Sequence, residues 1–169
     1  MNRLLSLGLM ACLLGTACHS PVAKQGADST QVETSAGALR SFTIPDSSLR
    51  QISSPDTVFA DGSRPSTWDI AGFSDPVAFK KFIALFKDWV AHDQVDSVIA
   101  HVKFPLAHYK TAAELKAKYN EVFDSTMKAV VIQQPLNSIF RNYQGAMLGN
   151  GQLWWNELDG QYRIIAINK

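Results

Sequence analysis

Residues 142–169 read NYQGAMLGNGQLWWNELDGQYRIIAINK, and this stretch carries the clearest structural pattern in the chain. Asn150-Gly151 and Asp159-Gly160 are dipeptides that favour two-residue hairpin turns of the primed types. The segments beside these turns are apolar and rich in residues that favour strands. We therefore expect three antiparallel strands joined by two tight turns.

The register of these strands follows from the turns. If both turns contain two residues, Leu148 lies opposite Leu153, and Trp155 lies between Ala146 and Ile164. One face of the sheet then holds Ala146, Leu148, Leu153, Trp155, Tyr162, Ile164 and Ala166. The other face holds Tyr143, Met147, Trp154, Leu158, Ile165 and Ile167, beside Asn156 and Arg163.

Both faces of this predicted sheet are rich in large apolar side chains. A sheet with one face in water would instead alternate apolar and polar residues. Both faces therefore need cover. Helices can cover one face, and the second requires residues 42–73, another subunit or a ligand.

Helices are predicted upstream of the sheet. Ser74-Asp75-Pro76 begins an amphipathic helix, because Asp75 can cap it and a proline is tolerated in the first turn. A shorter helix follows from Asp93, and the capping-box pattern from Thr111 to Glu114 begins a third. Residues 124–133 are ambiguous between helix and strand and are interpreted as a short helix. The predicted class is α+β, with helices packed on a curved, mainly antiparallel sheet.

The chain begins with the pattern of a bacterial signal peptide at residues 1–17. Arg3 precedes an apolar run that is too short to span a bilayer, and small residues lead to Cys18. This ending resembles a lipobox, although Gly15 stands where Leu is usual. We expect acylation of Cys18 and attachment to a membrane of the bacterial cell envelope, with the domain outside the cytoplasm. Cleavage with release of the protein and an uncleaved anchor are the alternatives.

The remaining chain divides by composition. Residues 18–41 lack aromatic side chains and are predicted to be a flexible tether that starts at the lipobox cysteine. Residues 42–73 mix aromatic residues with Pro and Ser, and we expect an extended segment that lies on the domain. Residues 74–169 form the predicted α+β domain.

Charge and cysteine content exclude several kinds of function. The formal net charge is +1, and removal of the signal peptide with Arg3 leaves fifteen basic against fifteen acidic residues, which disfavours nucleic acid as a partner. Both cysteines precede residue 19, so the predicted domain has no disulfide, zinc-thiolate site or cysteine nucleophile. The sequence contains no phosphate-binding loop or known catalytic motif. Neither a metal nor a cofactor is predicted.

The order of elements resembles that of the nuclear transport factor 2-like superfamily. Residues 74–169 carry a helix pair, a short strand, a helix and then a meander that runs through the Asn150-Gly151 turn and Trp154-Trp155. The resemblance implies a cone in which a curved sheet wraps helices around a pocket, with frequent homodimers built on the outer sheet face. Enzymes of that superfamily place Asp, His or Tyr in the pocket, but none of their catalytic positions can be matched to a residue here.

The candidate chemistry is sparse. His108 is a weak candidate for a general base, because residues 104–109 are predicted to be a short edge strand with Leu106 and His108 on one face. His101 is more simply interpreted as a partly buried histidine bonded to the backbone. His92 is interpreted as a cation at a helix C-terminus.

Aromatic side chains are the candidate ligand-binding residues. Tyr109, Tyr143, Trp154 and Trp155 are suited to lining a ligand cavity or a protein interface, with packing in the core as the alternative. Trp154 and Trp155 must point to opposite faces of the sheet, so one site can use only one of them.

These observations favour a non-catalytic cell-envelope lipoprotein whose domain binds a small apolar ligand or a protein partner. A homodimer through the sheet face is expected. One alternative is a small pocket enzyme, such as a hydrolase, isomerase or dehydratase, with a His or Asp base. A second alternative is an envelope inhibitor or immunity-type protein.

Overall fold

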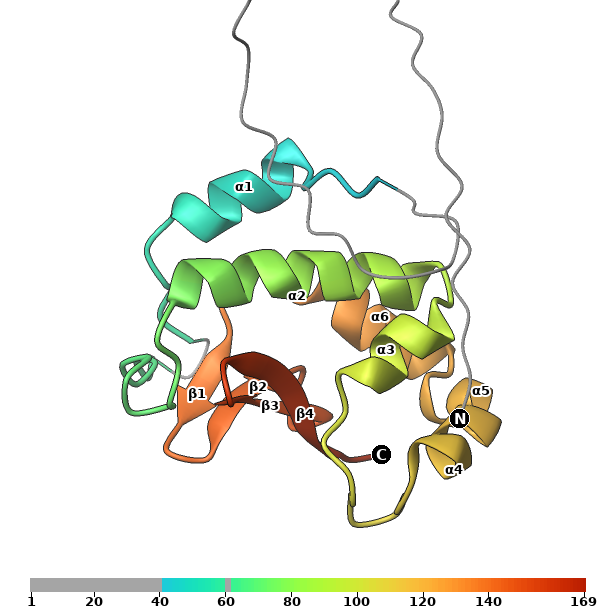
Figure 1. The fold of residues 1–169 in the computed structure, drawn as a ribbon. Helices are drawn as coiled ribbons and strands as arrows, with labels where there is room; N and C mark the ends of the chain where they lie inside the picture. Colours follow the sequence, from blue (N-terminus) through green and yellow to red (C-terminus); the bar gives the residue numbers. More distant parts are fainter. Residues whose placement is uncertain (1–40, 60–61) are drawn as a thin grey trace, which may run out of the picture. The chain divides into compact units, whose positions relative to one another are not determined.

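The computed structural model describes residues 41–59 and 62–169, which belong to one compact unit. In this unit helices pack on a four-stranded antiparallel sheet (Figure 1), and the predicted α+β class is confirmed. The predicted signal peptide, Cys18 and most of the tether lie outside the described residues. None of the described helices is long and apolar enough to cross a membrane.

The sheet is a simple meander in the order β1-β2-β3-β4. Its strands are β1 (Phe140–Asn142), β2 (Gly145–Leu148), β3 (Leu153–Leu158) and β4 (Gln161–Ile167). The predicted register is confirmed, because Leu148 pairs with Leu153 and Trp155 pairs with both Ala146 and Ile164. The short strand β1 was not predicted, and Tyr143 therefore lies in the turn that follows it instead of on a sheet face.

One prediction about the faces is wrong at the end of β4. Trp154 pairs with Ala166 and Trp155 pairs with Ile164, so Ile165 is an extra residue that forms a β-bulge. The bulge moves Ala166 to the side of Trp154 and turns Ile167 toward the core, where it is 7% exposed. The two residues thus exchange the faces that strict alternation assigned to them.

The two turns differ. Asp159 and Gly160 both have positive φ (52° and 69°), as a primed two-residue turn requires. In the other turn Gly149 and Gly151 have positive φ and Asn150 does not, so the predicted primed turn is wrong there. The side chain of Gln134 accepts a hydrogen bond from Gly149 N–H (2.8 Å), which ties this wider loop to the preceding helix.

Helix α2 (Pro76–Ala91) is the centre of the helical layer, and it begins as predicted. The Asp75 carboxylate caps it by accepting a hydrogen bond from Ala78 N–H (2.9 Å). One side of α2 packs on the sheet through Phe79, Phe82 and Phe86. Its opposite side is covered by α1 (Asp46–Ser53), which lies over α2 in Figure 1.

The other helices are short. They are α3 (Val95–Ala100), α4 (Ala112–Ala117), α5 (Tyr119–Val122) and α6 (Ser125–Gln133). Thr111 caps α4 by accepting from Glu114 N–H (3.2 Å), and Asp124 caps α6 by accepting from Met127 N–H (2.9 Å). The interpretation of residues 124–133 as a helix is confirmed.

Two other predictions about secondary structure are wrong, namely the strand at residues 104–109 and the fully extended form of residues 42–73. Residues 104–109 form a bent loop instead of a strand, in which Leu106 N–H donates to the Tyr109 carbonyl (2.8 Å). Pro105 has no N–H with which to extend a ladder, and the bridge to the sheet forms earlier, between Val102 and Ile164.

The segment 42–73 is not uniformly extended, because it contains α1. This helix follows Pro45 and presents Leu49 and Ile52, three residues apart, as its larger apolar side chains. Ile52 is buried, and so are Ala71 and Phe73 farther along the segment. The helix is therefore stabilised by packing on α2.

Candidate functional site

The space between the helices and the sheet, where the family resemblance places a pocket, is filled by aromatic side chains. Trp155 has no exposed surface, and its ring centroid lies 4.7 Å from that of Phe86, 5.5 Å from Phe82 and 6.4 Å from Phe79. The rings meet at steep angles, as edge-to-face packing requires. Trp155 is thus part of the core.

The predicted ligand-binding residues do not come together in the structure. Tyr109 is half-buried in the loop between α3 and α4. Tyr143 is 80% exposed in the β1–β2 turn. Trp154 is half-exposed on the face opposite to buried Trp155. The weak catalytic candidate His108 is exposed in the same loop as Tyr109, so the strand alternation that would have directed its side chain is absent.

The face of the sheet that carries Trp154 holds a partly exposed apolar row. Phe140, Met147, Trp154 and Ala166 form one row across the four strands. The Phe140 ring lies 6.3 Å from the Trp154 ring and 5.6 Å from the ring of Phe59, which covers one end of the row. We call this row the outer face. Its residues are open enough to contact a partner.

A second open surface lies where the end of α3 diverges from β4. It is a depression of about 340 Å³ lined by Phe82, Ala100, His101, Gly160, Gln161, Tyr162 and Arg163. We call it the β4-edge depression. It combines aromatic rings with two side chains that can carry positive charge.

His101 forms one wall of the β4-edge depression. Its Nδ1 lies 2.8 Å from the Ser97 carbonyl oxygen, which can only accept, so Nδ1 carries the proton and Nε2 is an acceptor. The ring lies 5.0 Å from that of Phe82 and 4.9 Å from that of Trp89. Burial lowers the pKa of His101, and the charge of Arg163 lowers it further against the opposing effect of the Ser97 hydrogen bond. The prediction of a partly buried, backbone-bonded histidine is confirmed.

Arg163 also lines the β4-edge depression. Its guanidinium donates hydrogen bonds to the Ala100 carbonyl and to the side-chain oxygen of Gln161. Both acceptors are neutral, and Arg163 has no ion pair within the described ranges. The depression is therefore bordered by a cation whose charge is not compensated. Arg163 could not be identified from the sequence, because its hydrogen-bond partners depend on where α3 ends.

A buried ionic cluster joins four separate segments on the helix side of the sheet. The Asp56 carboxylate accepts hydrogen bonds from Lys80 Nζ (2.7 Å), Arg141 Nη2 (2.8 Å) and Trp68 Nε1 (3.0 Å). Lys80 and Arg141 are each 5% exposed. The Arg141 guanidinium also lies 4.1 Å from the centroid of the Trp68 ring, a cation–π contact.

The protonation of this cluster follows from its contacts. Burial alone would raise the pKa of Asp56, but the hydrogen bonds from Lys80 and Trp68 and the charge of Arg141 outweigh it, so the pKa lies below its ordinary value. Burial lowers the pKa of Arg141, and the charge of Asp56 opposes this. The cluster ties residues 56 and 68 to α2 and β1, which is a structural role.

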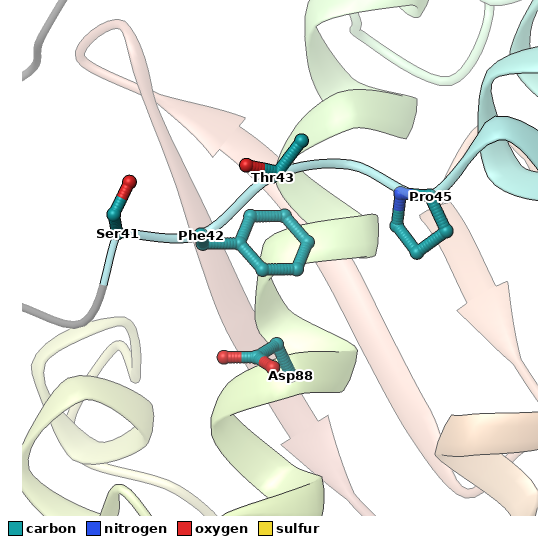
Figure 2. A pocket seen from close by; sticks show the side chains of 5 residues that line it. All are labelled: Ser41, Phe42, Thr43, Pro45 and Asp88. Carbon is teal, nitrogen blue, oxygen red and sulfur yellow. The ribbon is translucent and has the colours of Figure 1, made fainter.

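A second depression, of about 420 Å³, lies beside α2 and is lined by Ser41, Phe42, Thr43, Pro45 and Asp88. Figure 2 shows Asp88 as its single ionisable side chain, below the Phe42 ring. Asp88 is already paired with His92 (3.0 Å), which stands at the C-terminal end of α2 as predicted. This depression brings no second reactive group to Asp88.

The described part of the chain contains no group of three His, Cys, Asp or Glu side chains placed to hold a metal ion. The chemically distinctive surfaces are thus the outer face and the β4-edge depression. Comparison of the chain with protein-family models, with curated proteins and with solved structures found no match.

Proposed function

We propose that this chain is a lipid-anchored protein of the bacterial cell envelope whose domain binds a protein partner without catalysing a reaction. The observation that carries the proposal is the half-exposed apolar outer face. Exposed apolar patches on soluble proteins can mark sites of protein interaction. The attachment through Cys18 rests on the signal-peptide and lipobox pattern alone.

A protein partner fits better than a small apolar ligand. An apolar ligand of drug size needs a concave site that covers most of its surface. The interior position that would supply such a site is occupied by Trp155 and the three phenylalanines around it. A row of partly exposed apolar side chains on a sheet instead suits contact with another protein surface.

A second copy of this chain is the first partner to test. The outer face lies along a four-stranded meander, and a symmetric dimer would place one copy of the row against the other. Trp154, near the middle of the row, would be buried on both sides of such an interface. Central buried tryptophans contribute strongly to binding.

Sedimentation of the wild-type protein and of Trp154→Glu tests this partner. We expect a wild-type dimer and a Trp154→Glu monomer, because the variant would bury two carboxylates. Ile70→Glu is the matched control, since Ile70 is 58% exposed but lies in a turn outside the outer face. A photo-crosslinking residue at position 154 in host cells would show whether the contact is a second copy or another envelope protein. Absence of any crosslinked protein would contradict the proposal.

The anchor is tested separately. Cells fed a labelled fatty acid should incorporate the label into the wild-type protein and not into Cys18→Ser. Absence of label from the wild-type protein would exclude acylation at Cys18 and leave the protein-binding proposal to be judged by sedimentation and crosslinking.

A further inference from the structure

We propose that the β4-edge depression binds the C-terminal end of an extended peptide, with its terminal carboxylate at Arg163 and its last side chain against Phe82 and His101. This site is distinct from the outer face. It therefore goes beyond the proposed function, and its failure would leave that proposal untouched.

The edge of β4 offers unpaired backbone groups beside the depression. Ile164 uses its outward N–H and carbonyl to bond His101 O (2.7 Å) and Lys103 N (2.9 Å). Backbone groups of alternate residues point to the same edge of a strand, and the bulge lies beyond Ile164, so Tyr162 also directs its N–H and carbonyl outward. Neither group has a backbone partner across this edge in the part of the chain that the structure describes. An extended peptide can supply both missing partners.

The free edge of β4 is short, so it can accept the end of a peptide but not a strand that continues through the site. Residues 101–103 occupy the edge at Ile164, and the Asp159-Gly160 turn ends the strand on the other side. Between these limits, the backbone groups of Tyr162 are the outward-directed ones without a partner among the described residues. A strand that passed through the site would collide with residues 101–103, whereas a peptide that ends there would not.

The positive charge of Arg163 favours the carboxylate end of a peptide over the amino end. Arg163 has five N–H donors, and its two acceptors leave some of them free. No carboxylate among residues 41–59 and 62–169 pairs with it. The acidic residues that act on neighbouring Tyr162 are engaged elsewhere. Glu157 accepts from Ser74 N–H (2.8 Å) and Oγ (2.7 Å), and Asp75 caps α2. A terminal carboxylate would compensate Arg163, and a terminal amine would be repelled by it.

The remaining wall selects an apolar or aromatic last side chain. The rings of Phe82 and His101 lie 5.0 Å apart, and Tyr162 lies 5.2 Å from Phe82. A side chain placed among them would cover the rings that line the depression. Aromatic pairs at such distances contribute favourably beyond the area that they bury.

N-acetyl-L-phenylalanine is the smallest probe that carries the amide, the ring and the carboxylate together. We would titrate it into the isotope-labelled full chain in detergent micelles and follow the amide signals by NMR. Saturable shifts should be centred on Tyr162 and Arg163, with millimolar affinity because the probe is small. The primary amide of the same probe should bind about tenfold more weakly.

Arg163→Gln should abolish the preference for the acid over the amide. Arg50→Gln is the matched control, since Arg50 is exposed on α1 away from the site, and it should keep the preference. An N-methylated probe, which lacks the N–H for the Tyr162 carbonyl, should bind more weakly to the unaltered protein. Equal binding of acid and amide, shifts centred elsewhere, or no shift at tens of millimolar probe would each overturn the proposal.

Discussion

Trp154 and Trp155 are adjacent in sequence and lie in opposite environments. Trp155 is fully buried among the phenylalanines of α2, whereas Trp154 is half-exposed on the outer face beside Phe140. The two side chains are chemically identical and belong to the same strand, β3. The helical layer, and not the hydrophobicity of the strand, therefore determines which face becomes the core.

The largest expected effect separates these two residues. Trp155→Ala should lower the free energy of unfolding by about 4 kcal/mol, because it leaves a large cavity among Phe79, Phe82 and Phe86. Trp154→Ala should lower it by about 1 kcal/mol or less in the monomer, since its side chain is already partly exposed to water. Urea denaturation followed by circular dichroism measures both values. Similar losses for the two variants would mean that the outer face is covered as fully as the inner one.

Substitution of Asp56 in the buried ionic cluster tests whether the inner side of the sheet tolerates unpaired charge. Asp56→Ala should cost about 3 kcal/mol, because it leaves Lys80 and Arg141 as buried cations without their shared carboxylate. Exposed Asp69→Ala is the control and should change stability little. Denaturation at neutral pH measures the difference.

The stability that this cluster contributes should also depend on pH. The pKa of Asp56 is lower in the folded protein than in the unfolded chain, so its stabilisation is present above its ordinary pKa and is lost as the pH falls through the folded value. A wild-type protein that loses no more stability in acid than Asp56→Ala would contradict the assigned role of the carboxylate.

Local signals predicted much of the fold. The turn dipeptides predicted the register of β2, β3 and β4, and Asp75, Thr111 and Asp124 indicated where helices begin. These features depend on neighbours within a few residues, so the sequence displays them directly.

Features that depend on distant contacts could not be predicted. Asp56 meets Lys80 and Arg141 across 24 and 85 residues, and no spacing rule connects them. The Ile165 bulge has no turn or glycine to mark it, and strict alternation therefore placed Ile167 on the wrong face. The backbone bond of His101 was predicted, but its contacts with Phe82 and Trp89 were not, because these neighbours come from α2.

The position of Trp155 also depends on a close backbone approach at Gly145. A Cβ atom at Gly145 would lie 2.1 Å from the Trp155 carbonyl oxygen, and the backbone there has a φ of +129°. Gly145→Ala should therefore cost about 2 kcal/mol or more. Gly160→Ala is the matched control, because it has positive φ but open space, and it should cost about 1 kcal/mol. Equal thermal stability of the two variants would show that contact with β3 does not constrain β2.

The smallest effect is expected for His101, which lines the β4-edge depression. Its side chain faces the rings of Phe82 and Trp89, the Ser97 carbonyl and the charge of Arg163. Its pKa is lowered from the ordinary 6.5, so the unfolded chain binds the proton more readily than the folded protein. The free energy of unfolding should therefore fall as the pH decreases from about 7 to about 5, and His101→Gln should reduce this fall. His108→Gln controls for the loss of a histidine, since His108 lies exposed in a loop. Denaturation at several pH values measures this dependence. If His101→Gln and the wild-type protein lose the same stability in acid, the contacts with α2 and Arg163 do not keep the His101 ring neutral. The β4 edge would then offer a second cation in place of the acceptor Nε2.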